Sequence, residues 1–232
     1  SSTTYVTGTA AKMAAEELRE KIIHKLAQFM DVKPEDIDFD GLVGTTKDGT
    51  KKMSVQELAP KLLVGTTSEQ LNGFATWGSH TSPPPFMASI AEVKVDKQTG
   101  QIIPLHMYNC VDCGTVVNPK LARVQVEGGA VQAIGMALYE DVRYSSNGRL
   151  ETNNFMTYKI PTRQDIGELH TAFVESYEES GAYGVKSIGE IVINTACPAI
   201  QHAVKNAVGA DLRTLPMTPE KVFMAMDAKY KV

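Results

Sequence analysis

The segment Met87–Gly114, MASIAEVKVDKQTGQIIPLHMYNCVDCG, decides the fold class of this chain. Ile90, Val93 and Val95 lead into the turn DKQTG, and a second apolar run, Ile102–Asn109, follows that turn. Alternating β-branched and apolar residues on both sides of a glycine-containing turn predict a β-hairpin. We therefore expect a sheet at the centre of the chain.

A long helix is predicted directly after the hairpin, in the segment VNPKLARVQVEGGAVQAIGMALYE. Asn118 is expected to cap its N-terminus, with Pro119 in its first turn. Three positions inside this helix are glycines: Gly128, Gly129 and Gly135. Each costs about 1 kcal/mol relative to alanine. We therefore expect another helix or a cofactor to lie close against this backbone.

The remaining segments predict further helices and short strands. Strands are expected at Ile37–Val43, near Lys52–Met53 and at His170–Tyr177, with a second hairpin pairing Leu138–Tyr144 and Leu150–Met156. Helices are expected after Thr4 to about Met30, from Ser54 to Leu63, from Glu190 to about Val208 with a kink at Pro198, and from Thr218. Hairpin-built sheets packed with long helices define an α+β fold. The loop SHTSPPPF, Ser79–Phe86, is a candidate boundary between two subdomains of one region, 1–232.

Composition excludes several classes of function. The 232 residues carry a formal net charge of -4, without a basic block of the kind that binds nucleic acid. No apolar run approaches the roughly 20 residues that span a bilayer, and no secretory pattern is present. Three cysteines do not form a disulfide framework. We therefore expect a cytoplasmic protein with no nucleic-acid or membrane partner.

The pair Cys110 and Cys113 has the spacing of a zinc site or a redox dithiol. Zinc needs four ligands, whereas the third cysteine, Cys197, lies in a predicted helix and the five histidines show no ligand spacing. A redox pair usually starts a helix, but this pair ends a predicted strand. We expect the pair to be incidental, with zinc or dithiol chemistry as the alternative.

The first four residues, Ser1, Ser2, Thr3 and Thr4, all carry hydroxyl groups in front of a predicted helix. Such a cluster is either ordinary capping or a seat for an anion. Because capping needs only one hydroxyl, four in succession favour the anion site.

A single acid, Glu190, stands between the glycine-rich loop GVKSIG and an apolar helix. A carboxylate at this position can simply stabilise the positive end of the helix dipole. It can also be a general base that faces a pocket, because such loops often position polar groups against ligands. Both interpretations are compatible with the residues alone.

Six segments, in order along the chain, share one resemblance. They are SSTTYVTGTA (1–10), AEVKVDKQTGQI (91–102), VDCGTVVNPKLARVQVEGGAVQAIG (111–135), YKIPTRQDI (158–166), AYGVKSIGE (182–190) and LPMTPEKV (215–222). Together they resemble the molybdenum hydroxylases, the xanthine dehydrogenase and aldehyde oxidase group. The resemblance extends over the whole chain and implies the C-terminal part of the molybdopterin-binding subunit.

The resemblance implies a role for each candidate residue. In that family the glutamate of this loop is the general base, which takes a proton from a molybdenum-bound hydroxide or water as that oxygen attacks an electron-poor carbon. Glu190 is therefore the expected catalytic residue. The expected cofactor-binding residues, none of them a metal ligand, are Ser1, Ser2, Thr3, Thr4, Gln125, Lys186 and Gly189. The implied cofactor is molybdenum held by molybdopterin in its cytosine dinucleotide form.

The resemblance also implies partners. Iron–sulfur clusters and FAD are expected on partner domains or subunits, and other cofactor contacts on a preceding segment of the molybdenum subunit. We therefore expect this chain to be a fragment or a split subunit that is inactive alone. The expected substrate is an N-heterocycle, either a purine such as xanthine or a nicotinate-like ring, with aldehydes as an alternative. A non-catalytic scaffold is the alternative function.

Overall fold

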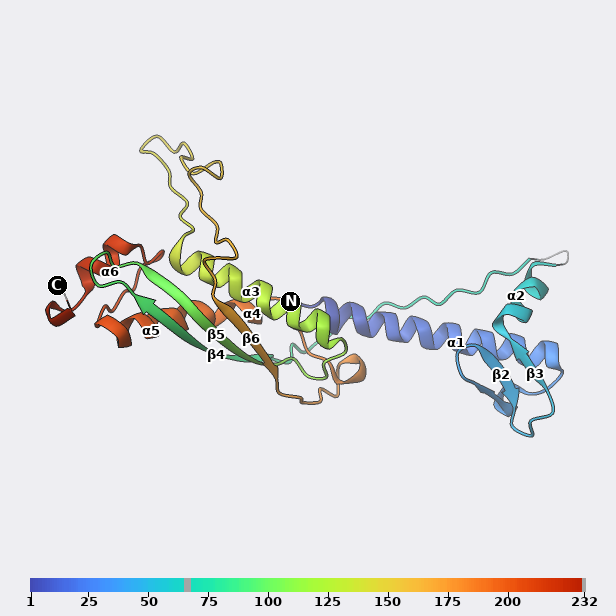
Figure 1. The fold of residues 1–232 in the computed structure, drawn as a ribbon. Coiled ribbons are helices and arrows are strands. Elements are labelled where there is room, and N and C mark those ends of the chain that lie inside the picture. The colour runs from blue at the N-terminus through green and yellow to red at the C-terminus, as the bar shows by residue number, and fades with distance from the viewer. Residues whose placement is uncertain (65–67, 231–232) are drawn as a thin grey trace. The chain divides into compact units, whose positions relative to one another are not determined.

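The computed structural model describes residues 1–64 and 68–230, which form two compact units (Figure 1). The smaller unit is Val6–His80, and the larger one combines Ser1–Tyr5 with Thr81–Val232. The chain passes from one unit to the other between Tyr5 and Val6, and again between His80 and Thr81 within the loop Ser79–Phe86. The helices and strands are, in chain order, η1 (Thr3–Thr7), α1 (Gly8–Met30), η2 (Pro34–Asp36), β1 (Ile37–Phe39), β2 (Val43–Thr46), β3 (Lys52–Ser54), α2 (Val55–Leu63), β4 (Phe86–Val95), β5 (Ile102–Asp112), α3 (Pro119–Leu138), β6 (Glu168–Phe173), η3 (Ala182–Gly184), α4 (Ile191–Asn194), α5 (Ala196–Val208), α6 (Pro219–Ala225) and η4 (Ala228–Tyr230).

The smaller unit packs α1 and α2 against the antiparallel sheet β1-β2-β3. Its core consists of Leu26, Ala27, Met30, Ile37 and Leu58. The predicted helix 54–63 is confirmed, because Ser54 and Glu57 form the reciprocal capping box.

One strand prediction for the smaller unit was wrong. The expected strand Ile37–Val43 is two strands, because the chain turns between them at Gly41, where φ is +102°. Asp40 Oδ1 stabilises this turn by accepting the amides of Leu42 and Val43 at 2.8 and 2.7 Å. An aspartate that bonds the amides two and three residues further on competes with strand pairing.

The larger unit is built on the sheet β4-β5-β6. The predicted hairpin is confirmed as the antiparallel pair β4–β5, with a bulge at Glu92/Val93. Strand β6 pairs in parallel with β5, and α3 lies between them in sequence. Strand β6 runs from Glu168 to Phe173 rather than from the predicted His170 to Tyr177, because β5 ends at Asp112 and offers no partner beyond Val174.

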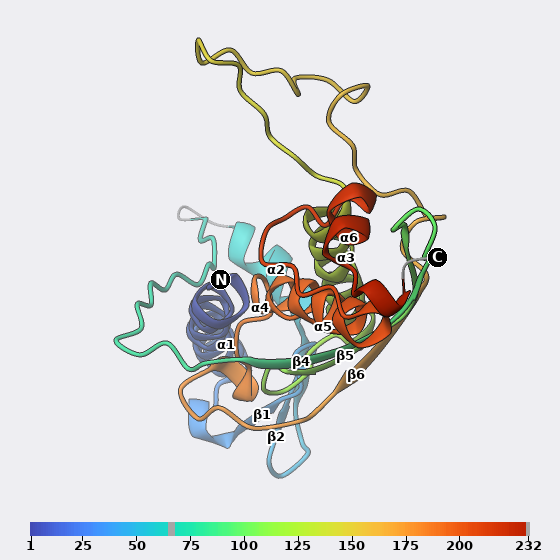
Figure 2. The same cartoon turned by 90° about the vertical axis from the view of Figure 1, so that its left-hand side faces the viewer.

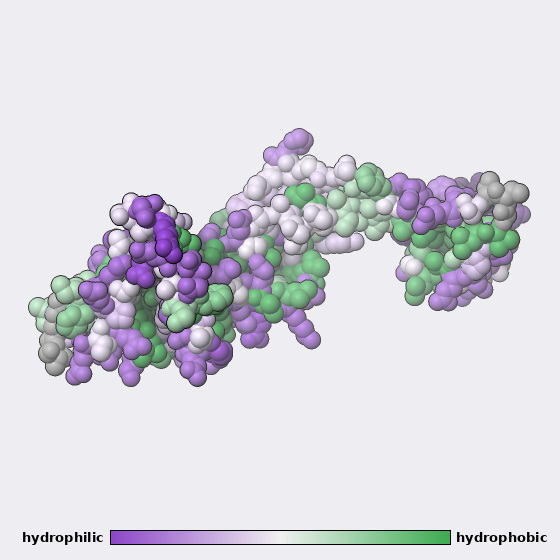
Figure 3. Space-filling view, turned by 90° about the horizontal axis from the view of Figure 1, so that it is seen from above, coloured by the Kyte–Doolittle hydropathy of each residue, from purple (hydrophilic) through white to green (hydrophobic). Residues whose placement is uncertain are grey.

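The helices α3 and α5 cover one face of this sheet (Figure 2). The large apolar side chains Met107, Ile134 and Ile200 are fully buried between these layers. Phe86 and Ile90 remain exposed on the other face, and Figure 3 shows hydrophobic residues in patches among hydrophilic ones on the side seen from above. The observed mixture of sheet and helix confirms the predicted α+β class.

Helix α3 begins as predicted, since Asn118 Oδ1 accepts the Leu121 amide at 3.1 Å and Pro119 is its first residue. The expectation of a close neighbour is confirmed at Gly129, where an added Cβ would lie 2.3 Å from Val192 Cγ2 of α4. It is wrong at Gly128, where a Cβ would meet nothing within 4 Å.

The predicted hairpin of Leu138–Tyr144 and Leu150–Met156 was wrong. Only the single bridge between Tyr144 and Leu150 forms, and the chain around this bridge extends away from the sheet (yellow in Figures 1 and 2). An isolated pair of strands is marginally stable without a sheet or helix to cover it.

The expected helix from Glu190 to Val208 is interrupted at Thr195, between α4 and α5. Pro198 explains the break, because a proline ring clashes with the carbonyl four residues earlier, here that of Asn194. The short helix after Thr218 is confirmed, with the Thr218 hydroxyl accepting the Lys221 amide. None of the described helices is both long and apolar enough to cross a bilayer.

Candidate functional site

All eight predicted site residues line one cavity of about 870 Å³ in the larger unit. Three segments surround this cavity: the first residues of the chain, the turn that leads from β5 into α3, and the loop in front of α4. The lining comprises Ser1, Ser2, Thr3, Thr4, Cys113, Thr115, Val116, Val117, Asn118, Leu121, Ala122, Gln125, Lys186, Ser187, Ile188, Gly189 and Glu190.

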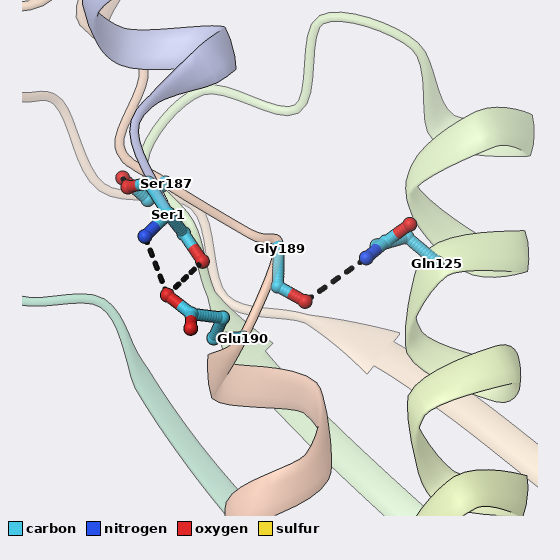
Figure 4. Close-up of polar contacts among 5 residues, drawn as sticks. All are labelled: Ser1, Gln125, Ser187, Gly189 and Glu190. Atoms are coloured by element: carbon cyan, nitrogen blue, oxygen red, sulfur yellow. Dashed lines mark hydrogen bonds and ion pairs between the residues drawn. The ribbon is translucent and has the colours of Figure 1, made fainter.

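The carboxylate of Glu190 points toward Ser1 and contacts it directly (Figure 4). Its Oε2 accepts the Ser1 hydroxyl at 2.8 Å. A hydrogen bond to a carboxylate oxygen favours the charged form of the carboxylate. The carboxylate is therefore ionised at neutral pH and can accept a proton.

Capping does not account for Glu190. It occupies the N-cap position of α4, yet its side chain makes no capping hydrogen bond, and α4 has only four residues. The side chain is 79% exposed, so it is open to a ligand in the cavity.

The loop that carries Glu190 is tied to α3 and to Ser1. Gln125 Nε2 donates to the Gly189 carbonyl at 2.9 Å (Figure 4), and the Ser187 hydroxyl donates to the Ser1 carbonyl. At Gly189 an added Cβ would lie 2.8 Å from Ser1 Oγ, so the Ser1 side chain would have to move to admit one. These contacts hold the backbone on both sides of the carboxylate.

Lys186 lines the cavity, but its ammonium group is paired with Asp112. Nζ lies 2.9 Å from Asp112 Oδ2, while Oδ1 accepts the Ser176 hydroxyl at 2.6 Å and the Gly114 amide at 3.0 Å. Burial raises the pKa of Asp112, but the hydrogen bonds from Ser176, Gly114 and Lys186 outweigh it, so the pKa lies below its usual value. Sequence reasoning missed Asp112 and Ser176. The only signal was an acid between the two cysteines of CVDC.

The two cysteines of that motif have different surroundings. Cys113 is buried in a core cluster with Val111, whereas Cys110 lies near Ala88 and His170, away from that cluster. Burial and then the charge of Asp112 raise the pKa of the Cys113 thiol, which disfavours the thiolate. Within residues 1–64 and 68–230, no three His, Cys, Asp or Glu side chains gather in a way that could hold a metal ion.

The sequence matches the family described as "Molybdopterin cofactor-binding domain" over residues 1–167. It is 36% identical to "Probable hypoxanthine oxidase XdhD" of Escherichia coli K12 over 231 residues, which are 98% of this chain and 24% of that protein. It is 33% identical to the "Xanthine dehydrogenase molybdenum-binding subunit" of Escherichia coli O157:H7 over 223 residues, 94% of this chain and 30% of that one.

The fold is also similar to a solved structure. Quinoline 2-oxidoreductase from Pseudomonas putida 86 superposes with a TM-score of 0.78 and 26% identity, over 91% of this chain and 28% of the other. The chain thus spans between about a quarter and a third of the length of these relatives.

The residues around the cavity fit a molybdopterin group. The hydroxyls of Ser2, Thr3, Thr4 and Thr115 line the cavity and can donate hydrogen bonds to phosphate and pterin atoms, whereas those of Ser1 and Ser187 already donate within the protein. The cavity volume is in the usual range for ligand sites. The chain therefore belongs to the molybdopterin cofactor-binding domain family and corresponds to part of the molybdopterin-binding subunit of a molybdenum hydroxylase.

Proposed function

We propose that this chain supplies the catalytic base and part of the cofactor site of an enzyme that hydroxylates an electron-poor carbon of an N-heterocycle, using oxygen from water. The observation that carries the proposal is the position of Glu190. Its carboxylate is exposed at a cavity lined by all eight predicted residues, where it accepts the Ser1 hydroxyl at 2.8 Å. A general base needs both a free acceptor oxygen and a fixed backbone, and the loop offers both.

Each residue has a defined task in this proposal. When bound, the molybdenum cofactor supplies the oxidation of the substrate carbon and lowers the pKa of the attacking water. Glu190 accepts the proton from that water at Oε1 or Oε2. The hydroxyls of Ser1, Ser2, Thr3 and Thr4 bind the phosphate and pterin end. Gln125 keeps the loop in place through the Gly189 carbonyl.

The proposal extends to the rest of the enzyme. The cofactor is the cytosine dinucleotide form of molybdopterin, and electrons leave to iron–sulfur clusters and FAD on partner domains or subunits in the cytoplasm. The remaining segment of the molybdenum subunit completes the pocket, so residues 1–232 are one region of a larger site and are inactive alone. The name of one relative, a molybdenum-binding subunit, supports this division of labour.

An N-heterocycle is the proposed substrate class because the names of three relatives each contain such a ring compound. Hypoxanthine, xanthine and quinoline are all aromatic rings in which nitrogen withdraws electrons from a neighbouring carbon. Turnover of the holoenzyme with hypoxanthine, xanthine and quinoline, compared with an aldehyde of similar size, tests this class. Faster turnover of the aldehyde than of all three rings would contradict it.

The test of the catalytic role is Glu190→Gln in the holoenzyme. We expect the rate to fall on the order of 10²-fold or more, since the amide cannot accept the proton, while the molybdenum content stays the same. Glu220→Gln is the matched control, because Glu220 is also an exposed acid at a helix start, in the first turn of α6, and is absent from the cavity lining. Equal and small effects of the two substitutions would reduce Glu190 to a helix-start acid and favour a scaffold.

A further inference from the structure

The pair formed by Asp112 and Lys186 has no role in the proton transfer described above. We propose that this pair positions the loop that carries Glu190, so that Lys186 acts through the backbone and not as a direct ligand of the cofactor. The catalytic consequence of this inference rests on the proposed function, whereas the positioning itself rests on geometry alone.

The pair is shielded from water. The Lys186 and Asp112 side chains are only 10% and 19% exposed, and the Lys186 ammonium lies 5.5 Å from the centre of the Phe86 ring. A desolvated ammonium group is costly unless a carboxylate compensates it, and removing one member leaves the other charge unpaired. Removing either member of this pair is therefore costly, because the other charge stays shielded and unpaired.

The carboxylate of Asp112 is itself fixed from two more sides. Ser176, three residues beyond the end of β6, donates its hydroxyl to Oδ1, and the Gly114 amide donates to the same oxygen. Asp112 thus joins the end of β5, the segment after β6 and the Glu190 loop in one hydrogen-bond network. The side chains and the amide in this network come from separate segments of the chain, so no single helix, strand or loop contains them all.

Backbone contacts place the same lysine at the same strand end. The Lys186 amide donates to the Cys113 carbonyl at 2.8 Å, the Thr115 amide donates to the Gly184 carbonyl at 2.9 Å, and Gly114 and Val185 form a β-bridge. Only three residues separate Lys186 from Glu190. A side chain locked to the strand therefore limits where the carboxylate can go.

Lys186 is not available to bind an anionic group in the cavity. Among the residues that line the cavity it is the one lysine or arginine, so it would be the natural partner of an anionic group. Its charge is already neutralised by Asp112 at 2.9 Å. The structure assigns the binding of anionic groups to hydroxyls and amides instead.

Amide hydrogen exchange of the full-length enzyme tests the inference without relying on turnover. The variants are Lys186→Met and Asp112→Asn, the double substitution, and Lys205→Met as a matched control. Lys205 pairs with Asp211 at 3.0 Å, but both side chains are well exposed, at 47% and 39%. The reporters are the hydrogen-bonded amides of Thr115 and Lys186.

We expect both single substitutions to accelerate exchange at these amides on the order of tenfold or more, because each leaves an unpaired charge. In the double variant these amides should exchange no faster than in the single variant with the faster exchange. In the control Lys205→Met they should exchange at the wild-type rate. The milder Ser176→Ala, which removes one hydrogen bond to Asp112, should accelerate exchange by a smaller factor. It keeps the test usable if a charge variant fails to fold.

Two results would overturn the inference. One is unchanged exchange in both Lys186→Met and Ser176→Ala. The other is loss of molybdenum and pterin from Lys186→Met without faster exchange, which would make Lys186 a direct ligand of the cofactor. Full activity of Glu190→Gln would instead overturn the proposed function and leave the exchange result standing, so the two failures can be told apart.

Discussion

Two aspartates each hold a loop in place, one in each unit, by different means. In the smaller unit, Asp48 Oδ1 accepts the hydroxyls of Thr46 and Thr50 at 2.6 and 2.8 Å and the Thr50 amide at 3.0 Å. All three donors lie within two residues of Asp48 in the turn between β2 and β3. The turn is therefore stabilised by its own sequence.

In the larger unit, Asp112 draws its donors from three separate places in the chain. Ser176 and Lys186 are 64 and 74 residues away in sequence, and only Gly114 is near. The Asp48 arrangement can form in a short peptide, whereas the Asp112 arrangement exists only when the sheet and the Glu190 loop have folded together. A local sequence motif therefore could not reveal that Asp112 holds the Glu190 loop.

The largest expected difference lies in the stability of two lysine variants. Lys186→Met should lower the free energy of unfolding by about 3 kcal/mol, because it leaves Asp112 unpaired where it is largely buried. Lys205→Met breaks an exposed pair and should change it by less than about 0.5 kcal/mol. Urea denaturation of the full-length protein measures both. Equal changes in the free energy of unfolding of the two variants would contradict the expected difference between the shielded and the exposed ion pair.

A second difference concerns adjacent glycines of α3. Gly129→Ala should destabilise the protein by about 1–3 kcal/mol, because the new Cβ would lie 2.3 Å from Val192 Cγ2 and 2.9 Å from the Val192 backbone carbon.

Gly128→Ala is the control for this pair of sites. Its Cβ would meet nothing within 4 Å, so the better helix propensity of alanine should raise the free energy of unfolding by about 0.5–1 kcal/mol. Thermal unfolding monitored by circular dichroism gives the sign of each change. A stabilising effect of Gly129→Ala, like that expected for Gly128→Ala, would show that α4 does not pack against α3 as described.

The smallest effect is the titration of Asp48. The hydroxyl of Thr46 and then the amide and hydroxyl of Thr50 lower its pKa from 3.8 to about 2. Because the folded-state pKa is depressed, the stabilisation is present above about pH 3.8 and is lost as the pH falls through about 2. A nuclear magnetic resonance titration should give a midpoint near 2. A midpoint near 3.8, unchanged by Thr46→Val, would exclude the hydrogen-bonded turn.

The sequence predicted the features that depend on neighbouring residues. The hairpin β4–β5, the capping box at Ser54 and the start of α3 all formed as expected, since turn and capping chemistry is local. The expected hairpin around the bridge Tyr144–Leu150 failed because no layer covers it. The parallel pairing of β6 also escaped prediction, because it depends on how α3 crosses the sheet.

The candidate site, too, was predicted only in part. The resemblance to a family identified eight positions that the fold brings to one cavity. The contacts between them, such as Gln125 with the Gly189 carbonyl and Lys186 with Asp112, appear only in three dimensions. Asp112 lies between Cys110 and Cys113, whose spacing indicated metal or thiol chemistry, so its structural role was not predicted.

The most direct test of the central claim is metal and pterin analysis of the protein that carries this chain, purified from its native source with its partners. We predict bound molybdenum with a molybdopterin cytosine dinucleotide, and iron in the co-purifying subunits or domains. An intact assembly without molybdenum or pterin would contradict the account, and the cavity beside Glu190 would then have to serve another ligand.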